Sequence, residues 1–455
     1  MILFAYIVLV GYSCLVGLSY WRKAVYLAIL IDFLRDPVRK LVPGEPVWIT
    51  VSALLVWAFI FVGLCQRDWG RLRTALRAFP NLRRSLQLAV VAVIPGAIIA
   101  IISYNSGYKL AALGAVSYLA PFAGIAIGVL YARRVDDIYR LLGFYILVNS
   151  FGMIGSFAEY NRIPIPALGG LQGFTHLRSH RTSQILMVSG FYRGPDITAL
   201  HAAHVVMFSI LLMFRRWGTT TFWGGTALLG MVSLFLAGRR KMLIMPLVFL
   251  AGYILSAGSR GTRMLYRVVL PLLLAGICGY LLTTNRGEEM VSSEYVDFAS
   301  TIMDDGMKRA EKSIYLGTLE TIQQTGLFGS GLGSATQGGR YTAVATRNWQ
   351  EDGTSRAFAE LGMVGVGLLL ISALEMYRVC VISRQKTVRD FELNTLHALL
   401  LSICLADLAS FVVSHQHFSG DPSSGVLVLM LLGMAISLPS HLQDIDDQQG
   451  HTLPT

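Results

Sequence analysis

The sequence predicts an all-α fold: a polytopic bundle of about 12 or 13 transmembrane helices with a mainly helical extracytoplasmic cap. Composition is the first observation, because 54% of the 455 residues are hydrophobic and only 14% are charged, too few charges for an ordinary soluble domain. The second is a series of apolar runs with the roughly 20 residues that a bilayer requires, such as Val47–Cys65 and Leu86–Ser103. Helices suit such runs because each satisfies its own backbone hydrogen bonds in lipid.

The expected spans follow one another along the whole chain. They lie near residues 2–18, 24–35, 47–65, 86–103, 110–131, 141–157, 197–214, 220–237, 242–257, 268–284, 357–377, 394–413 and 423–440. The first has no preceding basic residue and no small-residue cleavage site, so we expect a retained helix rather than a signal peptide. The second is short and carries Asp32, so it either crosses the membrane or lies in the interface.

Basic residues predict the orientation. Lys and Arg concentrate in three short loops, 66–85, 132–140 and 378–390, which the positive-inside rule places in the cytoplasm. Alternation then makes 158–196 and 285–356 extracytoplasmic. The net charge of +11 is explained by these loops, so we expect no nucleic-acid partner.

The same alternation divides the chain into six parts. They are N-terminal transmembrane helices (1–157), a first extracytoplasmic loop (158–196), central transmembrane helices (197–284), a large extracytoplasmic cap (285–356), C-terminal transmembrane helices (357–440) and a cytoplasmic tail (441–455). The five cysteines lie in or beside apolar runs without ligand spacing. We therefore expect no disulfide and no zinc site. We also expect no other metal and no cofactor.

Two basic positions at the outer face are candidate anion-binding residues. Arg193 precedes Gly-Pro at the mouth of a helix, where it either binds an anionic head group or snorkels at the interface. Arg239 and Arg240 occupy a tight turn that faces outward if the helices alternate as predicted, which favours an anion site. With one helix more or fewer before it, the turn would be an ordinary basic loop in the cytoplasm. His201 and His204 share one helix face, more typical of polar bundle-interior residues than of a metal pair.

A glycine-rich run followed by acids marks the end of the cap. Glu351 and Asp352 stand at a helix mouth, where a carboxylate serves either as a general base or as a helix cap. Arg356 either orients that acid or pairs with Glu360 one turn later. His415, in the last outward loop, is a spare base candidate or a residue of an exposed polar turn.

Four motifs together resemble the bacterial O-antigen ligase and polysaccharide polymerase superfamily, GT-C-like integral membrane glycosyltransferases. They are Gly329-Ser-Gly-Leu-Gly333, Ala359-Glu-Leu-Gly-Met-Val-Gly365, Leu236-Ala-Gly-Arg-Arg240, and Arg193 before Gly-Pro. The resemblance covers about residues 190 to 370, and the helix count agrees over the rest. Ligases of this family typically carry a His about ten residues before the Glu-Leu-Gly glycine. Here Glu351 and Asp352 stand in that neighbourhood, which favours a polymerase.

The resemblance implies a metal-independent enzyme of the bacterial inner membrane that joins undecaprenyl-diphosphate-linked glycans at its outer face, for exopolysaccharide, capsule or O-antigen. Arg193, Arg239 and Arg240 would neutralise the diphosphate leaving group, and Glu351 or Asp352 would accept the acceptor proton. Expected partners are the lipid-linked oligosaccharide, membrane lipids and other polysaccharide assembly and export proteins. The alternatives are ligase-type transfer to another acceptor, and a transporter or flippase of lipid-linked glycans.

Overall fold

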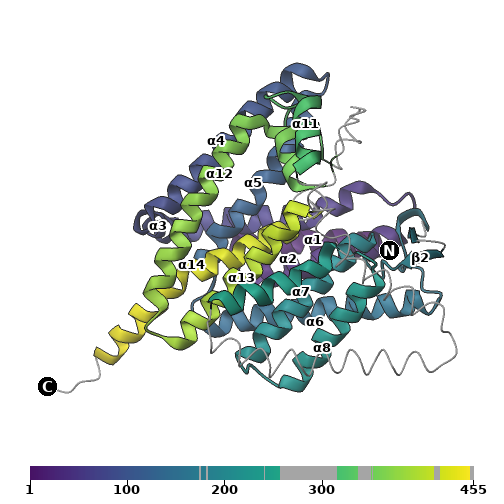
Figure 1. The fold of residues 1–455 in the computed structure, drawn as a ribbon. Helices are drawn as coiled ribbons and strands as arrows, with labels where there is room; N and C mark the ends of the chain where they lie inside the picture. The colour runs from purple at the N-terminus through teal and green to yellow at the C-terminus, as the bar shows by residue number, and fades with distance from the viewer. Residues whose placement is uncertain are drawn as a thin grey trace. The chain divides into compact units, whose positions relative to one another are not determined.

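The structure is a computed structural model that describes residues 1–173, 176–180, 183–239, 241–256, 315–336, 350, 352–413 and 421–450. Within these ranges the fold is all-α, with 13 helices and one two-stranded hairpin (Figure 1). Nine of the described helices are long and apolar enough to cross a membrane. The predicted fold class, a polytopic helical membrane protein, is confirmed.

The nine span-length helices follow the predicted apolar runs. They are α1 (Ile2–Ser19), α3 (Ser52–Ala78, preceded by the 3-10 turn η1, Val47–Val51), α4 (Pro80–Ser103), α5 (Gly107–Tyr131), α6 (Val135–Tyr160), α7 (Pro195–Phe214), α12 (Gly353–Thr387), α13 (Phe391–Val413) and α14 (Pro422–Gly450). Two shorter apolar helices, α8 (Thr220–Leu236) and Lys241–Ser256, match two further predicted runs. The predicted span 268–284 lies outside the described residues.

Helix α2 (Trp21–Leu41) differs from the short span predicted at 24–35. It has 21 residues and an amphipathic sequence that includes Asp32, Arg35, Asp36, Arg39 and Lys40. It is not among the nine candidate spans, because its charges exceed what a lipid-facing helix tolerates. Several of these charged side chains are nevertheless buried, so α2 brings polar groups into the protein interior.

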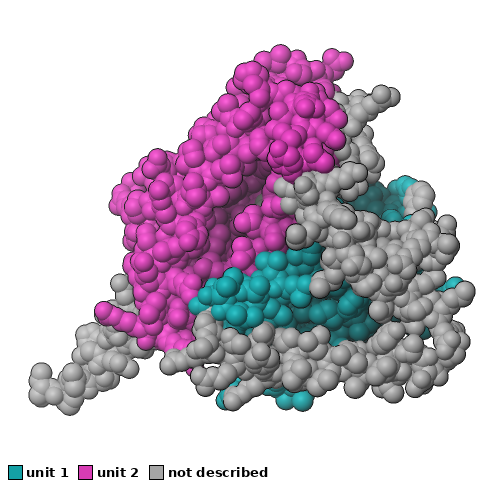
Figure 2. All heavy atoms as spheres, in the orientation of Figure 1, with its two compact units in different colours: residues 1–66, 136–306 teal, residues 67–135, 307–455 magenta. Residues whose placement is uncertain are grey.

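The chain forms two compact units that interleave along the sequence (Figure 2). The first comprises residues 1–66 and 136–306, and the second comprises 67–135 and 307–455. The boundary at 66/67 falls inside α3, next to a kink at Asp68 (φ −121°, ψ 19°).

In the first unit, α7 is buried along its whole length. Small residues allow close helix packing there: a Cβ at Gly230 of α8 would meet the carbonyl oxygen of Ala202 at 3.1 Å. The loop before α7 carries an antiparallel hairpin of β1 (His176–His180) and β2 (Ser183–Met187), with His176 opposite Met187. The N–H of Val188 donates to the carbonyl oxygen of Leu236 (3.1 Å), which ties this loop to the end of α8.

In the second unit, α5 packs against α14, and α4 packs against α12. Gly124 and Gly128 of α5 lie directly on the backbone of α14 at Val426 and Met430. The buried Ser85 hydroxyl of α4 donates to the Ser372 carbonyl oxygen of α12 (2.8 Å). A short helix, α11 (Gly317–Thr325), packs against α12 and lies within the predicted cap, of which most residues are outside the described ranges.

Candidate functional site

Arg193 is held at the N-terminal end of α7 by a carboxylate of α2. Its backbone N–H donates to Asp36 Oδ2 (3.1 Å), and its Nη1 donates to Asp36 Oδ1 (3.2 Å). Asp36 is 1% exposed and Arg193 is 13% exposed. Pro195 then begins the helix with the backbone angle that the first helical position requires. The guanidinium is therefore fixed beside the positive end of the α7 dipole.

Arg239 reaches the same helix end from the turn after α8. Its Nε lies 2.7 Å from Oδ1 of Asp196, in the first turn of α7, and this pair is about a quarter exposed. Gly238 allows the tight turn with φ +63°. His176 of β1 is near enough that Arg239 acts on it: burial first and Arg239 second lower the pKa of His176, while Asp196 opposes them. Two of the three predicted arginines thus engage acids near one helix N-terminus.

Lys40, at the C-terminal end of α2, anchors the loop that carries Arg193. Its Nζ donates to the carbonyl oxygens of Ala167 (3.2 Å), Gly190 (2.9 Å) and Tyr192 (2.6 Å). Burial lowers the pKa of Lys40 to about 8. From α6, Glu159 accepts from the N–H of Gly190 (2.5 Å). The loop is therefore attached to two helices immediately before Arg193.

A polar chain runs into the interior of the first unit from this position. His201 Nδ1 lies 2.7 Å from the Tyr145 hydroxyl, which lies 3.3 Å from His204 Nδ1. On its other side, His201 Nε2 lies 4.0 Å from Asp32 Oδ2, and Tyr192 stacks on the imidazole at 4.8 Å. Both histidines are buried, as predicted for residues of the bundle interior. Asp32 and His201 offer one carboxylate and one imidazole to a proton or a cation.

In the second unit, Arg356 pairs with Glu360, which is one of the two arrangements expected from the sequence. The Nε of Arg356 lies 3.3 Å from Glu360 Oε1, and both side chains are fully buried. Arg356 Nη2 donates to Ser117 Oγ (2.8 Å), and its guanidinium lies 5.0 Å from the centroid of the Tyr118 ring. Glu360 Oε1 also accepts from the N–H of Ala335 (3.0 Å). The pair links α12 to α5 and to the glycine-rich segment.

The glycine-rich segment fills a break in α12. The helix is interrupted at Gly362 (φ +65°, ψ −178°). On the two sides of the break, Ser330 N–H donates to the Ala359 carbonyl oxygen (2.7 Å), and Met363 N–H donates to the Leu327 carbonyl oxygen (2.9 Å). These bonds replace helical ones, so the backbone groups at the break remain satisfied as a membrane requires.

Asp352 caps α12. Its Oδ1 accepts from the Ser355 N–H (2.7 Å) and from the Thr354 hydroxyl (2.7 Å), and the residue is 4% exposed. Glu351, Arg240 and His415 lie outside the described residues. Of the two acids predicted at this helix mouth, the one that is described is bonded to its own helix.

No protein-family model matches this chain, and no curated protein sequence matches it. The chain is a multi-pass membrane protein. Its described helices have the length and hydropathy that crossing a membrane requires.

The sequence reasoning missed the acids that hold the arginines. Asp36 binds Arg193 and Asp32 approaches His201, whereas the sequence predicted only a short helix at 24–35 that crosses the membrane or lies in the interface. A signal was present, because Asp32, Arg35, Asp36 and Arg39 recur at spacings of three and four within one amphipathic helix. Ionisable residues in a membrane protein's helices point to a functional site or to a partner for another buried charge.

Proposed function

We propose that this protein is a polysaccharide polymerase that joins undecaprenyl-diphosphate-linked glycan units at the outer face of a bacterial inner membrane, without a metal. The observation that carries the proposal is the arrangement of Arg193 and Arg239 at the N-terminal end of α7. Arg215 and Arg216 lie at the other end of this helix, which the positive-inside rule places in the cytoplasm. The two candidate arginines are therefore expected at the outer leaflet.

The two arginines differ in how an anion could reach them. The Arg193–Asp36 pair is nearly buried, whereas the Arg239–Asp196 pair is 27% and 29% exposed. An exposed ion pair contributes little stability, so a diphosphate can displace Asp196 at small cost. Guanidinium groups bind phosphate oxygens through two parallel N–H donors. In this proposal Arg239 contacts the diphosphate directly, and Arg193, paired with Asp36, fixes the N-terminal end of α7 beside it.

In the proposed reaction, the largest change in charge occurs on the leaving diphosphate. An acceptor sugar hydroxyl attacks the anomeric carbon of the donor, and the bond from that carbon to the diphosphate oxygen breaks. The negative charge that develops on the diphosphate is stabilised by preorganised cations. The hydroxyl proton passes to a carboxylate. Because Asp352 is bonded as a helix cap, we assign this proton to Glu351.

One observation favours the second candidate, a transporter or flippase of lipid-linked glycans. Transporters often contain discontinuous membrane helices, and α12 is interrupted at Gly362. The break lies only nine residues after Gly353, where the helix begins, and Leu327 and Ser330 satisfy its backbone groups. It therefore serves to pack the glycine-rich segment, and we retain the enzyme as the first proposal.

A product assay distinguishes these functions. Purified full-length protein is incubated in detergent with an undecaprenyl-diphosphate oligosaccharide and a metal chelator. We expect lipid-linked glycans of increasing length. Movement of the intact lipid across a liposome bilayer without any longer product would establish the transporter instead. Products formed only when a different lipid acceptor is supplied would establish ligase-type transfer.

A further inference from the structure

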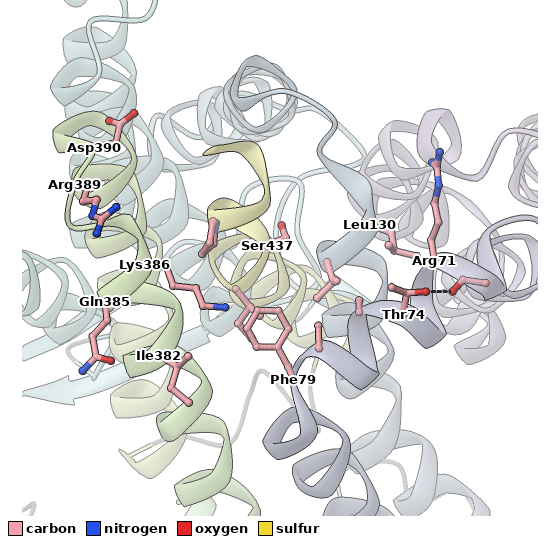
Figure 3. Close-up of a pocket in the computed structure, with 16 residues that line it drawn as sticks. Arg71, Thr74, Phe79, Leu130, Ile382, Gln385, Lys386, Arg389, Asp390 and Ser437 are labelled. Carbon is pink, nitrogen blue, oxygen red and sulfur yellow. Dashed lines mark hydrogen bonds between the residues drawn. The ribbon is translucent and has the colours of Figure 1, made fainter. Parts of the chain in front are cut away.

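The second unit contains an open cavity of about 1400 Å³ at the ends of its helices that bear the basic loops (Figure 3). Residues of α3, α5, α12 and α14 line it, together with Phe79 between α3 and α4 and with Arg389 and Asp390 between α12 and α13. The cavity is larger than the roughly 300–1,000 Å³ of a small-molecule pocket. The positive-inside rule places this end of the unit at the cytoplasmic face.

The walls of the cavity are mainly apolar. They include Leu130 near the end of α5, Ile382 in the last part of α12, and Ile436 and Pro439 at the end of the apolar part of α14, Pro422–Pro439. Because Leu130 and Pro439 lie at the ends of candidate membrane spans, this part of the wall is expected where the acyl chains meet the headgroups. An apolar wall at this depth suits the upper part of a lipid chain rather than a water-soluble ligand.

Three cations surround this apolar surface: Arg71, Lys386 and Arg389. In Figure 3, Lys386 extends from α12 toward Phe79, with Arg71 on the opposite side, and its Nζ lies 5.3 Å from the centroid of the Phe79 ring. Arg71 is 3.6 Å from Asp68 and 67% exposed, so that pair is weak.

The acidic side chain in the described lining is hydrogen-bonded to backbone N–H groups. Asp390 is the acid among the described lining residues, and its Oδ1 accepts from the backbone N–H groups of Glu392 (2.7 Å) and Leu393 (3.0 Å) at the start of α13. The cavity therefore presents net positive charge above apolar walls. That combination matches an anionic amphiphile.

We infer that this cavity binds the headgroup of an anionic glycerophospholipid from the cytoplasmic leaflet. The phosphate would lie among Arg71, Lys386 and Arg389, and the first part of the acyl chains would lie against the apolar walls. The site is independent of the proposed polymerase reaction, because none of the residues that line it is assigned a role in that reaction. Free inorganic phosphate would make no use of the apolar walls.

The test is lipid retention by the full-length protein, measured by native mass spectrometry after incubation with equal amounts of phosphatidylglycerol and phosphatidylcholine. We expect phosphatidylglycerol to be retained preferentially. The double variant Lys386→Gln/Arg389→Gln should retain it about 30-fold more weakly, since each surface cation contributes roughly 1 kcal/mol to binding an anionic lipid. The control is Arg73→Gln/Arg77→Gln, because these exposed arginines share α3 with Arg71 but do not line the cavity.

Three results would overturn the inference. They are equal retention of the two lipids by the parent protein, equal losses in the two double variants, and displacement of phosphatidylglycerol by millimolar inorganic phosphate. The comparison of lipids on the parent protein needs no variant, so poor folding of a variant would leave the inference testable. A loss confined to the cavity variant supports it.

Discussion

At the scale of single residues, several buried charges among the described residues have specific partners, and some of these partners lie far apart in sequence. Lys40 is an example outside the nine span-length helices. Its ammonium bonds three carbonyl oxygens of the loop before α7, and burial lowers its pKa to about 8. Removing it would leave those carbonyls without their donor, which costs more than a hydrogen bond contributes.

The variant Lys40→Met should therefore lower the free energy of unfolding at pH 7, by about 2 kcal/mol. The difference should also depend on pH. An exposed lysine has a pKa near 10.5, so between pH 8 and 10.5 the unfolded chain binds more protons than the folded one, and the parent gains stability as pH rises. The gap between parent and variant should widen over this window in thermal unfolding of the detergent-solubilised protein.

Lys23→Met is the matched control, because Lys23 is an exposed lysine near the other end of α2. A gap that stays constant or narrows from pH 8 to 10.5 would show that the Lys40 ammonium is not destabilised by burial.

Local pairs were predictable from the sequence, whereas distant ones were not. Arg356 and Glu360 are four residues apart in a helix, and such residues meet on one face. Asp36 and Arg193 are separated by 157 residues. Their meeting depends on how the loop before α7 folds back to α2, which hydrophobic periodicity does not encode. The arginine was therefore found as a candidate, but its carboxylate partner was not.

At the scale of elements, the interrupted helix α12 and the glycine-rich segment form one structure. Gly329, Gly331 and Gly333 all have positive φ, and Leu332 N–H donates to the carbonyl oxygen of Gly96 in α4 (2.8 Å). The sequence showed this segment only as a glycine-rich run before the acids at the helix mouth. The close approach that the structure shows is to α4, α5 and α12, which holds Glu360 in place through Ala335.

Gly333→Ala should destabilise the protein by about 3 kcal/mol, because its φ is +85° and an added Cβ would overlap the carbonyl oxygen of Leu110. Gly367→Ala, in the regular part of α12, has open space around its Cβ and should be neutral or slightly stabilising. Thermal unfolding of both variants checks this. Equal unfolding temperatures for the two would contradict the packing described for the segment.

At the scale of the whole molecule, apolar run length was enough to predict the fold class and the nine span-length helices of the described residues. The same pattern did not reveal the two interleaved units. One boundary between them falls inside α3, where the sequence contains no proline and no glycine-rich linker. The division into units depends on which helices pack against each other. The length of an apolar run indicates that a helix crosses lipid. It does not indicate which other helices that helix packs against.

The orientation of the chain can be tested by cysteine labelling. The exposed residues Arg162 and Arg134 follow α6 and precede α6, respectively. Because α6 crosses the membrane, a membrane-impermeant maleimide should label Arg162→Cys in intact cells, and it should label Arg134→Cys only after the cells are permeabilised. The parent protein gives the background from native cysteines. Labelling of Arg134→Cys in intact cells would show that the chain has the opposite orientation, and the proposed anion site would then not lie at the outer face.

The most direct test of the central claim is the rate of lipid-linked glycan elongation by Arg239→Gln beside Arg162→Gln, an exposed arginine of the loop that precedes α7. The account predicts a loss of at least about 100-fold in kcat for Arg239→Gln, because it would remove a donor that stabilises the leaving diphosphate, and a rate within about threefold of the parent for Arg162→Gln. Elongation by Arg239→Gln at the parent rate would contradict the assignment of the anion site, and a parent protein that elongates nothing would contradict the proposed function.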